Sequence, residues 1–294
     1  SSKLVVTGSK ESFLSMNNIL MMTAIFSIFL GVTYPLIIES MSGEKVSIGP
    51  PYYNTIFSPL ILITSFFIMI SVEALWQRSL PIRAVAYSVL PTIFFASISV
   101  YIIWIYTQIF SMLAYVGIFS GLLIFYSYFF RTINNFFKKR YINKGSAIAH
   151  MGLGLLFFSV SMNSILSYEK NINLFSGQSE RINESIQEFM FKDIKVYPAS
   201  NHEVISAEVF ILQDQKKIFL NPQKRQYMTR GQITSETAIH ATPLKDTYLT
   251  IGDQLENGSW TFSLKINYFV KWIWLSSALM VLGISIAMFK KKLT

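Results

Sequence analysis

The sequence predicts a membrane α-helical bundle of six transmembrane helices, with one mostly β extramembrane domain between helices five and six. Only 14% of the 294 residues are charged and 52% are hydrophobic, whereas soluble proteins have about 25% charged residues. The apolar residues are concentrated in six runs, each long enough to cross a bilayer. A polar segment between the fifth and sixth runs shows the apolar alternation of β-strands instead. This composition excludes an ordinary cytosolic enzyme.

The six apolar runs are interpreted as helices because lipid offers no hydrogen-bond partner to the backbone, so a spanning segment must satisfy its own amides. About 20 mainly apolar residues suffice to cross the hydrocarbon core. The predicted spans are about 17–38, 55–76, 84–106, 109–130, 146–166 and 269–289. The chain then has three regions, which are the first five helices in 1–166, the external domain in 167–268, and the final helix with a basic inner tail in 269–294.

Basic residues beside the spans predict the orientation of the chain. If the spans alternate, four segments fall on one side of the membrane, whereas the opposite loop 39–54 contains a single basic residue, Lys45. The positive-inside rule then puts both termini in the cytoplasm or matrix. The basic residues of the four inner segments are Lys3 and Lys10; Arg78 and Arg83; Arg131, Lys138, Lys139, Arg140 and Lys144; and Lys290, Lys291 and Lys292.

The segment 167–268 predicts a small, mostly antiparallel β domain on the external face. Apolar residues alternate in several short runs, and turn-forming residues separate these runs. One cluster, Asn257-Gly258-Ser259, predicts a hairpin turn before the run that begins at Trp260. An amphipathic helical piece is expected near 178–187. Basic and acidic residues are almost equal in number in this segment, so it lacks the electrostatic footprint of a nucleic-acid-binding domain.

His150 is the most informative residue of the predicted spans, because an ionisable side chain inside a membrane is costly and by default indicates function. A neutral imidazole is also a common axial ligand of haem iron. Ala147, His150 and Gly154 share one helix face, which could admit a flat macrocycle or a closely packed helix. From the span alone, two interpretations stay open. His150 is either an iron ligand or a histidine that is hydrogen-bonded to a neighbouring helix.

The other two histidines, His202 and His240, lie in the external domain and are interpreted as surface residues. At a rise of 1.5 Å per helical residue they cannot reach the iron that His150 would ligate. A second axial ligand must therefore come from another chain or from a part of the protein outside this sequence. Arg225 and Arg230 belong to a basic cluster of the same domain, which is interpreted as a solvated loop. A contact of this cluster with a haem propionate or an acidic partner is the alternative, and a haem contact of His240 also stays open.

Glu73 lies at the inner end of the second span. We interpret it as a carboxylate that reaches the membrane interface and pairs there, rather than as part of a proton relay. The chain has no cysteine, which excludes a disulfide framework, a thiolate metal site and a cysteine nucleophile within it. It also has no phosphate-binding glycine loop, zinc-protease motif or serine elbow, so no complete catalytic site is recognisable.

Several motifs, in order from about residue 8 to residue 283, resemble the C-terminal half of the CcmF family, the membrane haem lyase component of cytochrome c maturation. The stretch Ala149-His150-Met151-Gly152 resembles the span that carries a haem-ligand histidine in that family. Lys10 takes the place of the usual arginine in the first motif. The other matching stretches are Ser9-Lys10-Glu11 with Asn17-Asn18, Ser47–Asn54, Pro222–Tyr227, Arg230-Gly231, Thr234–Thr237 and Val270–Leu275.

The resemblance implies a role in attaching haem to apocytochrome c. In that family, haem arrives at the external face on the chaperone CcmE, and a CcmH-type thiol protein delivers the apocytochrome. A resident haem b held by two transmembrane histidines is thought to reduce the incoming haem. By this resemblance His150 is one of those two ligands, and the second belongs to the N-terminal CcmF half. No catalytic residue is assigned to this chain.

The family's tryptophan-rich haem-binding segment, its external histidine ligands and its second transmembrane histidine are absent from this sequence. The chain is therefore either a natural split C-terminal subunit or a piece of a longer protein. Split versions of this family occur in some mitochondrial genomes, and the bias of this chain towards Phe, Ile, Asn and Lys fits that source. The resemblance therefore implies the mitochondrial inner membrane, with both termini in the matrix and 167–268 in the intermembrane space. A bacterial plasma membrane with a periplasmic domain is the alternative. Two other functions stay open, a structural scaffold of the maturation complex and a small-molecule (haem) transporter subunit.

Overall fold

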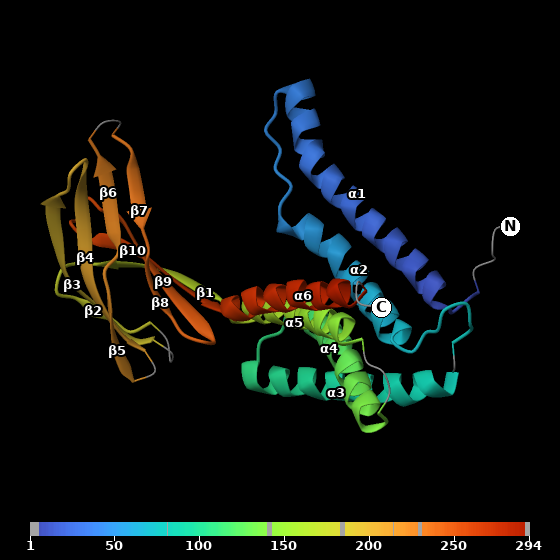
Figure 1. The fold of residues 1–294 in the computed structure, drawn as a ribbon. Coiled ribbons are helices and arrows are strands. Elements are labelled where there is room, and N and C mark those ends of the chain that lie inside the picture. Colours follow the sequence, from blue (N-terminus) through green and yellow to red (C-terminus); the bar gives the residue numbers. More distant parts are fainter. Residues whose placement is uncertain are drawn as a thin grey trace. The chain divides into compact units, whose positions relative to one another are not determined.

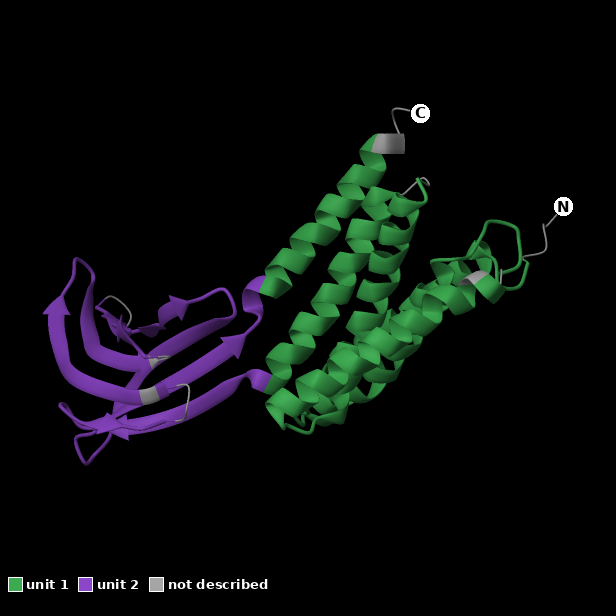
Figure 2. Cartoon of the chain, turned by 90° about the horizontal axis from the view of Figure 1, so that it is seen from below, with its two compact units in different colours: residues 1–165, 272–294 green, residues 166–271 purple. Residues whose placement is uncertain are grey.

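The computed structural model describes residues 6–80, 82–139, 143–182, 186–213, 215–228 and 231–291. The described residues contain six helices that are long and apolar enough to span a membrane (Figure 1). They are α1 (Lys10–Ser42), α2 (Pro50–Ser71), α3 (Ile82–Thr107), α4 (Met112–Phe137), α5 (Lys144–Leu166) and α6 (Val270–Lys291). The chain divides into a helical unit, residues 1–165 with 272–294, and a β unit, residues 166–271 (Figure 2). The predicted fold class is confirmed.

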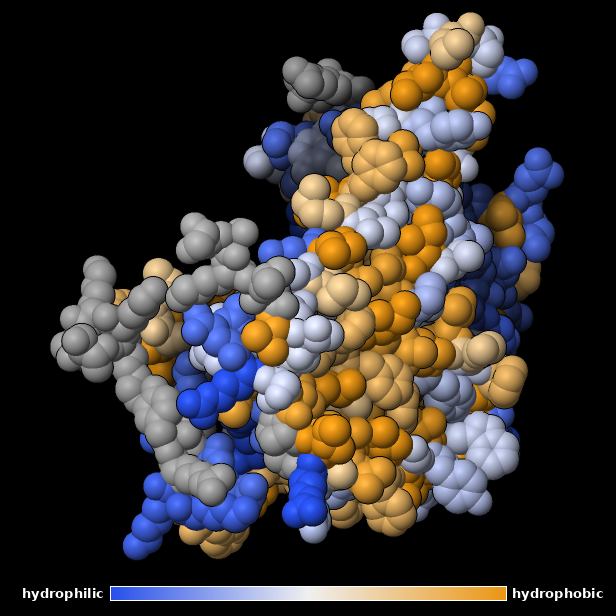
Figure 3. Space-filling model, turned by 90° about the vertical axis from the view of Figure 1, so that its right-hand side faces the viewer, coloured by the Kyte–Doolittle hydropathy of each residue, from blue (hydrophilic) through white to orange (hydrophobic). Residues whose placement is uncertain are grey.

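The outer surface of the helical unit is apolar, as a lipid-facing surface requires. Figure 3 shows hydrophobic side chains spread over the exposed face of the helices. On α1, the side chains of Ile25 and Phe26 are each 60% exposed and that of Leu36 is 62% exposed. Apolar surface of this extent is unfavourable in water and marks contact with another apolar phase. The chain is a multi-pass membrane protein.

Small residues let α5 lie against the helices on both of its sides. A Cβ atom added to Gly154 would lie 2.6 Å from the carbonyl oxygen of Gly121 on α4. A Cβ atom added to Gly145 would lie 2.6 Å from the backbone nitrogen of Ala287 on α6, and one added to Gly283 would lie 2.4 Å from that of Ala149. Because lipid tails are as apolar as the side chains, close backbone packing of this kind is a main source of helix association in membranes.

The β unit consists of two sheets that share one core. The first sheet has the order β1-β10-β9-β8, and the second has the order β2-β3-β4-β6-β7 with β5 also paired to β4; all pairs are antiparallel. The strands are β1 (Tyr168–Leu174), β2 (Ser179–Glu180), β3 (Ile186–Pro198), β4 (His202–Gln213), β5 (Lys216–Leu220), β6 (Gln223–Tyr227), β7 (Ile233–Glu236), β8 (Ala238–Ala241), β9 (Lys245–Gln254) and β10 (Trp260–Tyr268).

Three phenylalanines join the two sheets at the centre of this core. Phe189 and Phe191 of β3 and Phe262 of β10 are each fully buried. The ring centroid of Phe262 lies 5.5 Å from that of Phe189 and 4.9 Å from that of Phe191. These separations and tilted ring planes are those that aromatic pairs prefer. The alternation seen in the sequence therefore marks the inward faces of both sheets.

The structure also explains where that alternation breaks. The register of β3 against β4 shifts between Phe191 and Asp193, so one extra residue is inserted there. The next apolar residue, Ile194, packs against the core after this shift, whereas Val196 is 57% exposed. The hairpin turn predicted at 257–259 is present, and Gly258 adopts the left-handed conformation with φ +88°.

The amphipathic helical piece expected near 178–187 is wrong. In the described part of that segment, Ser179 and Glu180 form β2 and pair with Met190 and Phe189 of β3. The side chain of Ile186 is fully buried in the core of the sandwich. Strand pairing and burial in the two-sheet core therefore override the local helical pattern.

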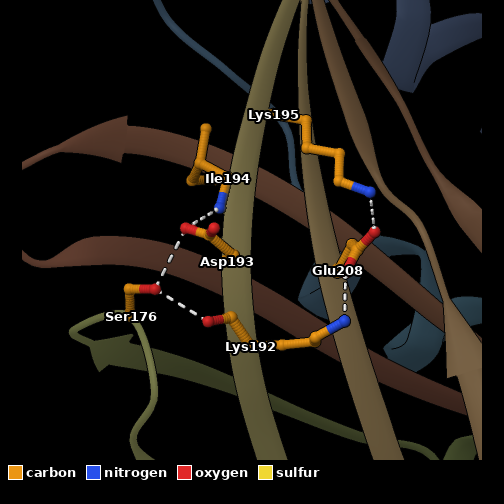
Figure 4. A network of polar contacts seen from close by, with 6 residues as sticks. All are labelled: Ser176, Lys192, Asp193, Ile194, Lys195 and Glu208. Atoms are coloured by element: carbon orange, nitrogen blue, oxygen red, sulfur yellow. Dashed lines mark hydrogen bonds and ion pairs between the residues drawn. The ribbon is translucent and has the colours of Figure 1, made fainter.

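One face of the second sheet carries a network of polar contacts (Figure 4). The carboxylate of Glu208 on β4 pairs with the ammonium groups of Lys192, at 2.9 Å, and Lys195 of β3. On the neighbouring turn, the hydroxyl of Ser176 donates to the carbonyl oxygen of Lys192 and to the carboxylate of Asp193. The network connects β3 to β4 and to the turn after β1.

Candidate functional site, a cavity around His150

His150 lines a cavity of about 570 Å³ in the helical unit. The walls come from α1, α2, α4 and α5 and from the connections next to them. The volume falls within the range of cofactor and small-molecule sites. The apolar part of the lining includes Phe13, Leu14, Leu20, Phe67, Ile68 and Leu153, and its polar part includes Lys10, Asn17, Tyr128, Arg131, Asn135, Asn143, Ser146 and His150. The cavity is therefore amphipathic.

The start of α5 fixes the orientation of the His150 ring. The side-chain oxygen of Asn143 accepts a hydrogen bond from the backbone N–H of Ser146 at 3.2 Å, which caps the helix. The carbonyl oxygen of Ser146 lies 2.8 Å from Nδ1 of His150. A carbonyl oxygen can only accept, so Nδ1 donates its proton and the lone pair of the neutral ring is on Nε2. This is the arrangement found in ligating histidines, whose second nitrogen is held by a backbone carbonyl.

Tyr128 of α4 supports the other side of the imidazole. The two rings are stacked with centroids 4.4 Å apart and planes inclined by 12°. His150 is held both by a hydrogen bond within its own helix and by an aromatic ring from the next one. A side chain restrained in this way pays little conformational entropy when it binds a ligand.

The structure divides the small-residue face that surrounds His150. Ala147 lines the cavity beside the imidazole, whereas Gly154 packs against the backbone of α4 at Gly121. Of the two uses that the sequence left open for this face, the close helix applies at Gly154. At Ala147 the face remains available to a ligand.

Two cations of the cavity were missed as site residues by the sequence analysis. Lys10 is the first residue of α1, and its ammonium lies 5.8 Å from the ring centroid of Trp76. Arg131 lies in the second-to-last turn of α4 and is three residues beyond Tyr128. Both were interpreted as markers of the inner membrane side, and Lys10 also as part of a motif that resembles the family, but neither as a site residue. The signal that could have singled out Lys10 is its place in the Ser9-Lys10-Glu11 motif.

That motif attaches α1 to the connection that follows α2. The hydroxyl of Ser9 caps α1 by accepting from the backbone N–H of Ser12 at 3.4 Å. Both oxygens of the Glu11 carboxylate lie 3.1 Å from the backbone N–H of Gln77, which has φ +55°. The backbone N–H of Lys10 donates to the carbonyl of Leu75 at 3.0 Å. Lys10 is thereby fixed at the edge of the cavity.

Glu73 forms an ion pair with Arg131, with a distance of 3.9 Å between Oε1 and Nη1. Glu73 is therefore better described as a carboxylate that pairs at the membrane interface, as predicted, than as part of a proton relay. The distance is at the limit for an ion pair, and both side chains are partly exposed, so the pair contributes little to stability.

The external residues of interest that the structure describes each have their own local surroundings. His202 packs against Tyr227, and its Nδ1 lies 2.7 Å from the side-chain oxygen of Asn201. Arg225 pairs with Glu236 at 3.3 Å. His240 lies on the short strand β8 and is half-buried. Arg230 lies outside the described residues. Within the described ranges, no group of three or more His, Asp or Glu residues could hold a metal ion.

The fold defines a class of protein, a polytopic membrane protein with a two-sheet β domain inserted before its last helix. Residues 165–268 match the family model described as the CcmF C-terminal beta-sandwich. The resemblance to the CcmF family, and to its C-terminal half, is thus confirmed.

Two bacterial relatives and one solved structure carry this resemblance over almost the whole chain. The "Cytochrome c-type biogenesis protein CcmF" of Pseudomonas aeruginosa is 27% identical over 293 residues, which cover 95% of this chain and 44% of that protein. The Escherichia coli protein of the same name is 28% identical over 280 residues, which cover 94% of this chain and 43% of that protein. The structure titled "Cytochrome c Heme Lyase CcmF" has a TM-score of 0.73 and 13% identity and covers 95% of this chain and 46% of its own. The chain spans less than half the length of these proteins.

The residues around the cavity fit a haem. Nε2 of His150 carries a lone pair suited to iron, and the apolar lining suits a porphyrin ring. The cations Lys10 and Arg131 suit the carboxylates that a haem carries. One histidine can offer one axial position to an iron.

Proposed function

We propose that this chain is the C-terminal subunit, or the C-terminal part, of a membrane cytochrome c haem lyase. His150 is one axial ligand of a transmembrane haem b, and the second ligand comes from the N-terminal CcmF half. The observation that carries the proposal is the Ser146–His150 hydrogen bond, which leaves Nε2 of a stacked, cavity-lining imidazole available to iron. The names of the relatives support the reaction.

In this proposal the residues of the chain bind and orient, and they provide no acid, base or nucleophile. Ser146 fixes the tautomer of His150, and Tyr128 fixes the plane of its ring. Close glycine contacts hold α5, which carries His150, against α4 and α6. When bound, a haem b supplies a redox centre that can pass an electron to haem arriving at the external face. The β unit offers a surface to the other maturation proteins.

The proposed partners are the N-terminal CcmF half, a CcmH-type thiol protein, the haem chaperone CcmE and apocytochrome c. The proposed location is the mitochondrial inner membrane, with both termini in the matrix and the β unit in the intermembrane space. The relatives described above are bacterial, which fits the alternative of a bacterial plasma membrane with a periplasmic β unit. The excess of basic residues in the four inner segments supports the orientation in either case.

The test is to purify the complex of this chain with its N-terminal companion and record its optical spectrum. We expect His150→Ala to remove the b-type bands and to abolish cytochrome c maturation, while His202→Ala and His240→Ala leave the bands in place. If the His150→Ala complex kept both the bands and the cytochrome c yield, the ligand assignment would be wrong. A complex without any bound haem would leave the chain as a scaffold.

A further inference from the structure

We infer that Lys10 and Arg131 bind the two carboxylates of the tetrapyrrole that His150 ligates, and that they turn its carboxylate edge towards the inner membrane surface. This inference rests on the proposed function and names the part of the haem that each side chain would recognise. It starts from the observation that α1, α4 and α5 bring Lys10, Arg131 and His150 to one cavity.

The depths of these side chains agree with one bound molecule. Tyr128 stacks on His150 and is therefore at the same level in the membrane. Arg131 is three residues further along α4, which is about 4.5 Å nearer the inner end at 1.5 Å per residue. Lys10 opens α1 at that same end of the cavity. A ring bound at Nε2 would meet both cations on its inner edge.

In the described part of the chain, carboxylates balance the positive charges at this end of the cavity only in part. Glu73 reaches Arg131 only at 3.9 Å, and the carboxylate of Glu11 is occupied by the backbone N–H of Gln77. In the ranges that the structure describes, Lys10 forms no ion pair, and its ammonium lies over Trp76. Two like charges beside an apolar cavity repel each other and are costly unless an anion joins them.

The shape of the lining specifies the kind of anion. Phe13, Phe67 and Leu153 form part of an apolar interior, and the cations lie at its edge. A molecule that fits must have a large apolar body and acidic groups on one side only. A porphyrin with two propionates has this form, and an arginine side chain can bind a carboxylate through two parallel hydrogen bonds.

A direct test compares haem with its dimethyl ester, in which both carboxylates are blocked. The haem-stripped complex of this chain and its N-terminal companion, in phosphatidylcholine nanodiscs, is titrated with each compound and followed by absorbance. We expect the unaltered complex to bind haem at least tenfold more tightly than the ester. In the variant Lys10→Gln/Arg131→Gln both compounds should bind about equally, at the level of the ester. The matched control is Arg83→Gln/Lys138→Gln, which removes two inner basic residues that do not line the cavity and should keep the discrimination.

Two further arms separate this inference from other roles of the cations. Glu73→Gln removes the ion pair but not the cation, so the preference for haem over its ester should remain. If this variant lost the preference for haem, Arg131 would act only as the partner of Glu73. Phosphatidylglycerol in the nanodiscs should not remove the preference for haem, and if it did, the cations would bind lipid phosphate instead. An unchanged preference in Lys10→Gln/Arg131→Gln would overturn the inference while His150 remained the ligand. Loss of haem bands only in His150→Ala would then still support the proposed function.

Discussion

The phenol ring of Tyr128 and the imidazole of His150 lie face to face, with centroids 4.4 Å apart and ring planes within 12° of each other. The two residues are on consecutive helices, α4 and α5, so the stack also joins those helices at the level of the cavity. Together with the hydrogen bond between Nδ1 and the carbonyl of Ser146, it determines the direction in which Nε2 points. Any ligand bound there takes its orientation from Tyr128 as well as from His150.

The first prediction concerns this stack. Tyr128→Leu should weaken haem binding by the complex about two- to tenfold, because an aromatic pair contributes about 0.5–1.5 kcal/mol beyond its buried area. Tyr128→Phe keeps the ring and should bind as the unaltered protein does. The measurement is a haem titration followed by absorbance. Equal binding by the Leu and Phe variants would show that the ring does not position His150.

The second prediction concerns the close approach of α4 and α5. Gly154→Ala places a Cβ atom 2.6 Å from the carbonyl oxygen of Gly121 and 2.7 Å from the backbone nitrogen of Phe125. The helices must move apart, which should cost about 1–3 kcal/mol, as overpacking does in cores. Thermal unfolding in detergent should show a lower midpoint. Gly49→Ser, at the N-cap of α2 where serine is favoured and where the nearest atom to an added Cβ would be 3.6 Å away, is the control and should not lower the midpoint.

The third prediction concerns the pH dependence of the β unit. The hydrogen bonds from Lys195 and Lys192 hold the pKa of the Glu208 carboxyl below its ordinary value of 4.5, and the bond to Glu208 raises the pKa of the Lys195 ammonium. A depressed folded-state pKa of a carboxyl stabilises the fold above the unfolded-state pKa, and this contribution is lost as the pH falls through the folded-state value. The raised pKa of Lys195 has the opposite sign, so its contribution is lost only on the alkaline side.

Amide hydrogen exchange of β3 and β4 in the whole chain should therefore be slow near neutral pH and should lose protection below about pH 4.5. In Glu208→Gln the loss at acid pH should be smaller, because the titrating partner is gone. Glu203→Gln, on the same strand but outside this network, is the control. If the unaltered chain, Glu208→Gln and Glu203→Gln all lost protection equally at acid pH, the stabilising role of the Glu208 carboxylate would be contradicted.

The fourth prediction concerns the aromatic core of the sandwich. Phe262→Ala removes a fully buried ring that packs against Phe189 and Phe191. It should lower the free energy of unfolding by about 3–5 kcal/mol. Phe219→Ala, at a side chain that is 51% exposed, should cost much less. Urea titrations of the whole chain, followed by near-ultraviolet circular dichroism, would contradict the prediction if both variants unfolded at the same midpoint.

The sequence was sufficient for the helices, because a long apolar run is visible without tertiary information. It also singled out His150 as an ionisable residue within such a run, and the role of that residue stays a prediction. The inward phenylalanines of the sandwich were equally accessible from alternation. The short segment near 178–187 was not, because its pairing with Met190 and burial of Ile186 depend on strands that lie far along the chain. Local pattern and tertiary contact disagreed there, and the contact prevailed.

The cations of the cavity show a different limit. In the sequence, Lys10 and Arg131 are two among many basic residues at the inner side, and the positive-inside rule accounts for all of them alike. Only the packing of α1 and α4 around one cavity separates these two from Arg83 or Lys138. A charge pattern can give the orientation of a membrane protein, but the neighbours of each charge depend on the assembled helices.

The pairing of β1 with β10 has a consequence for how the last helix is added. Tyr168, two residues after α5, is paired with Ile266, four residues before α6. Without this ladder, α5 and α6 would be joined by a flexible loop of about 100 residues. Bringing the two helices together would then cost the entropy of closing that loop. Once this ladder has formed, the end of α5 and the start of α6 are each only a few residues from the paired strands. Folding of the β unit thus raises the effective concentration of α6 beside α5.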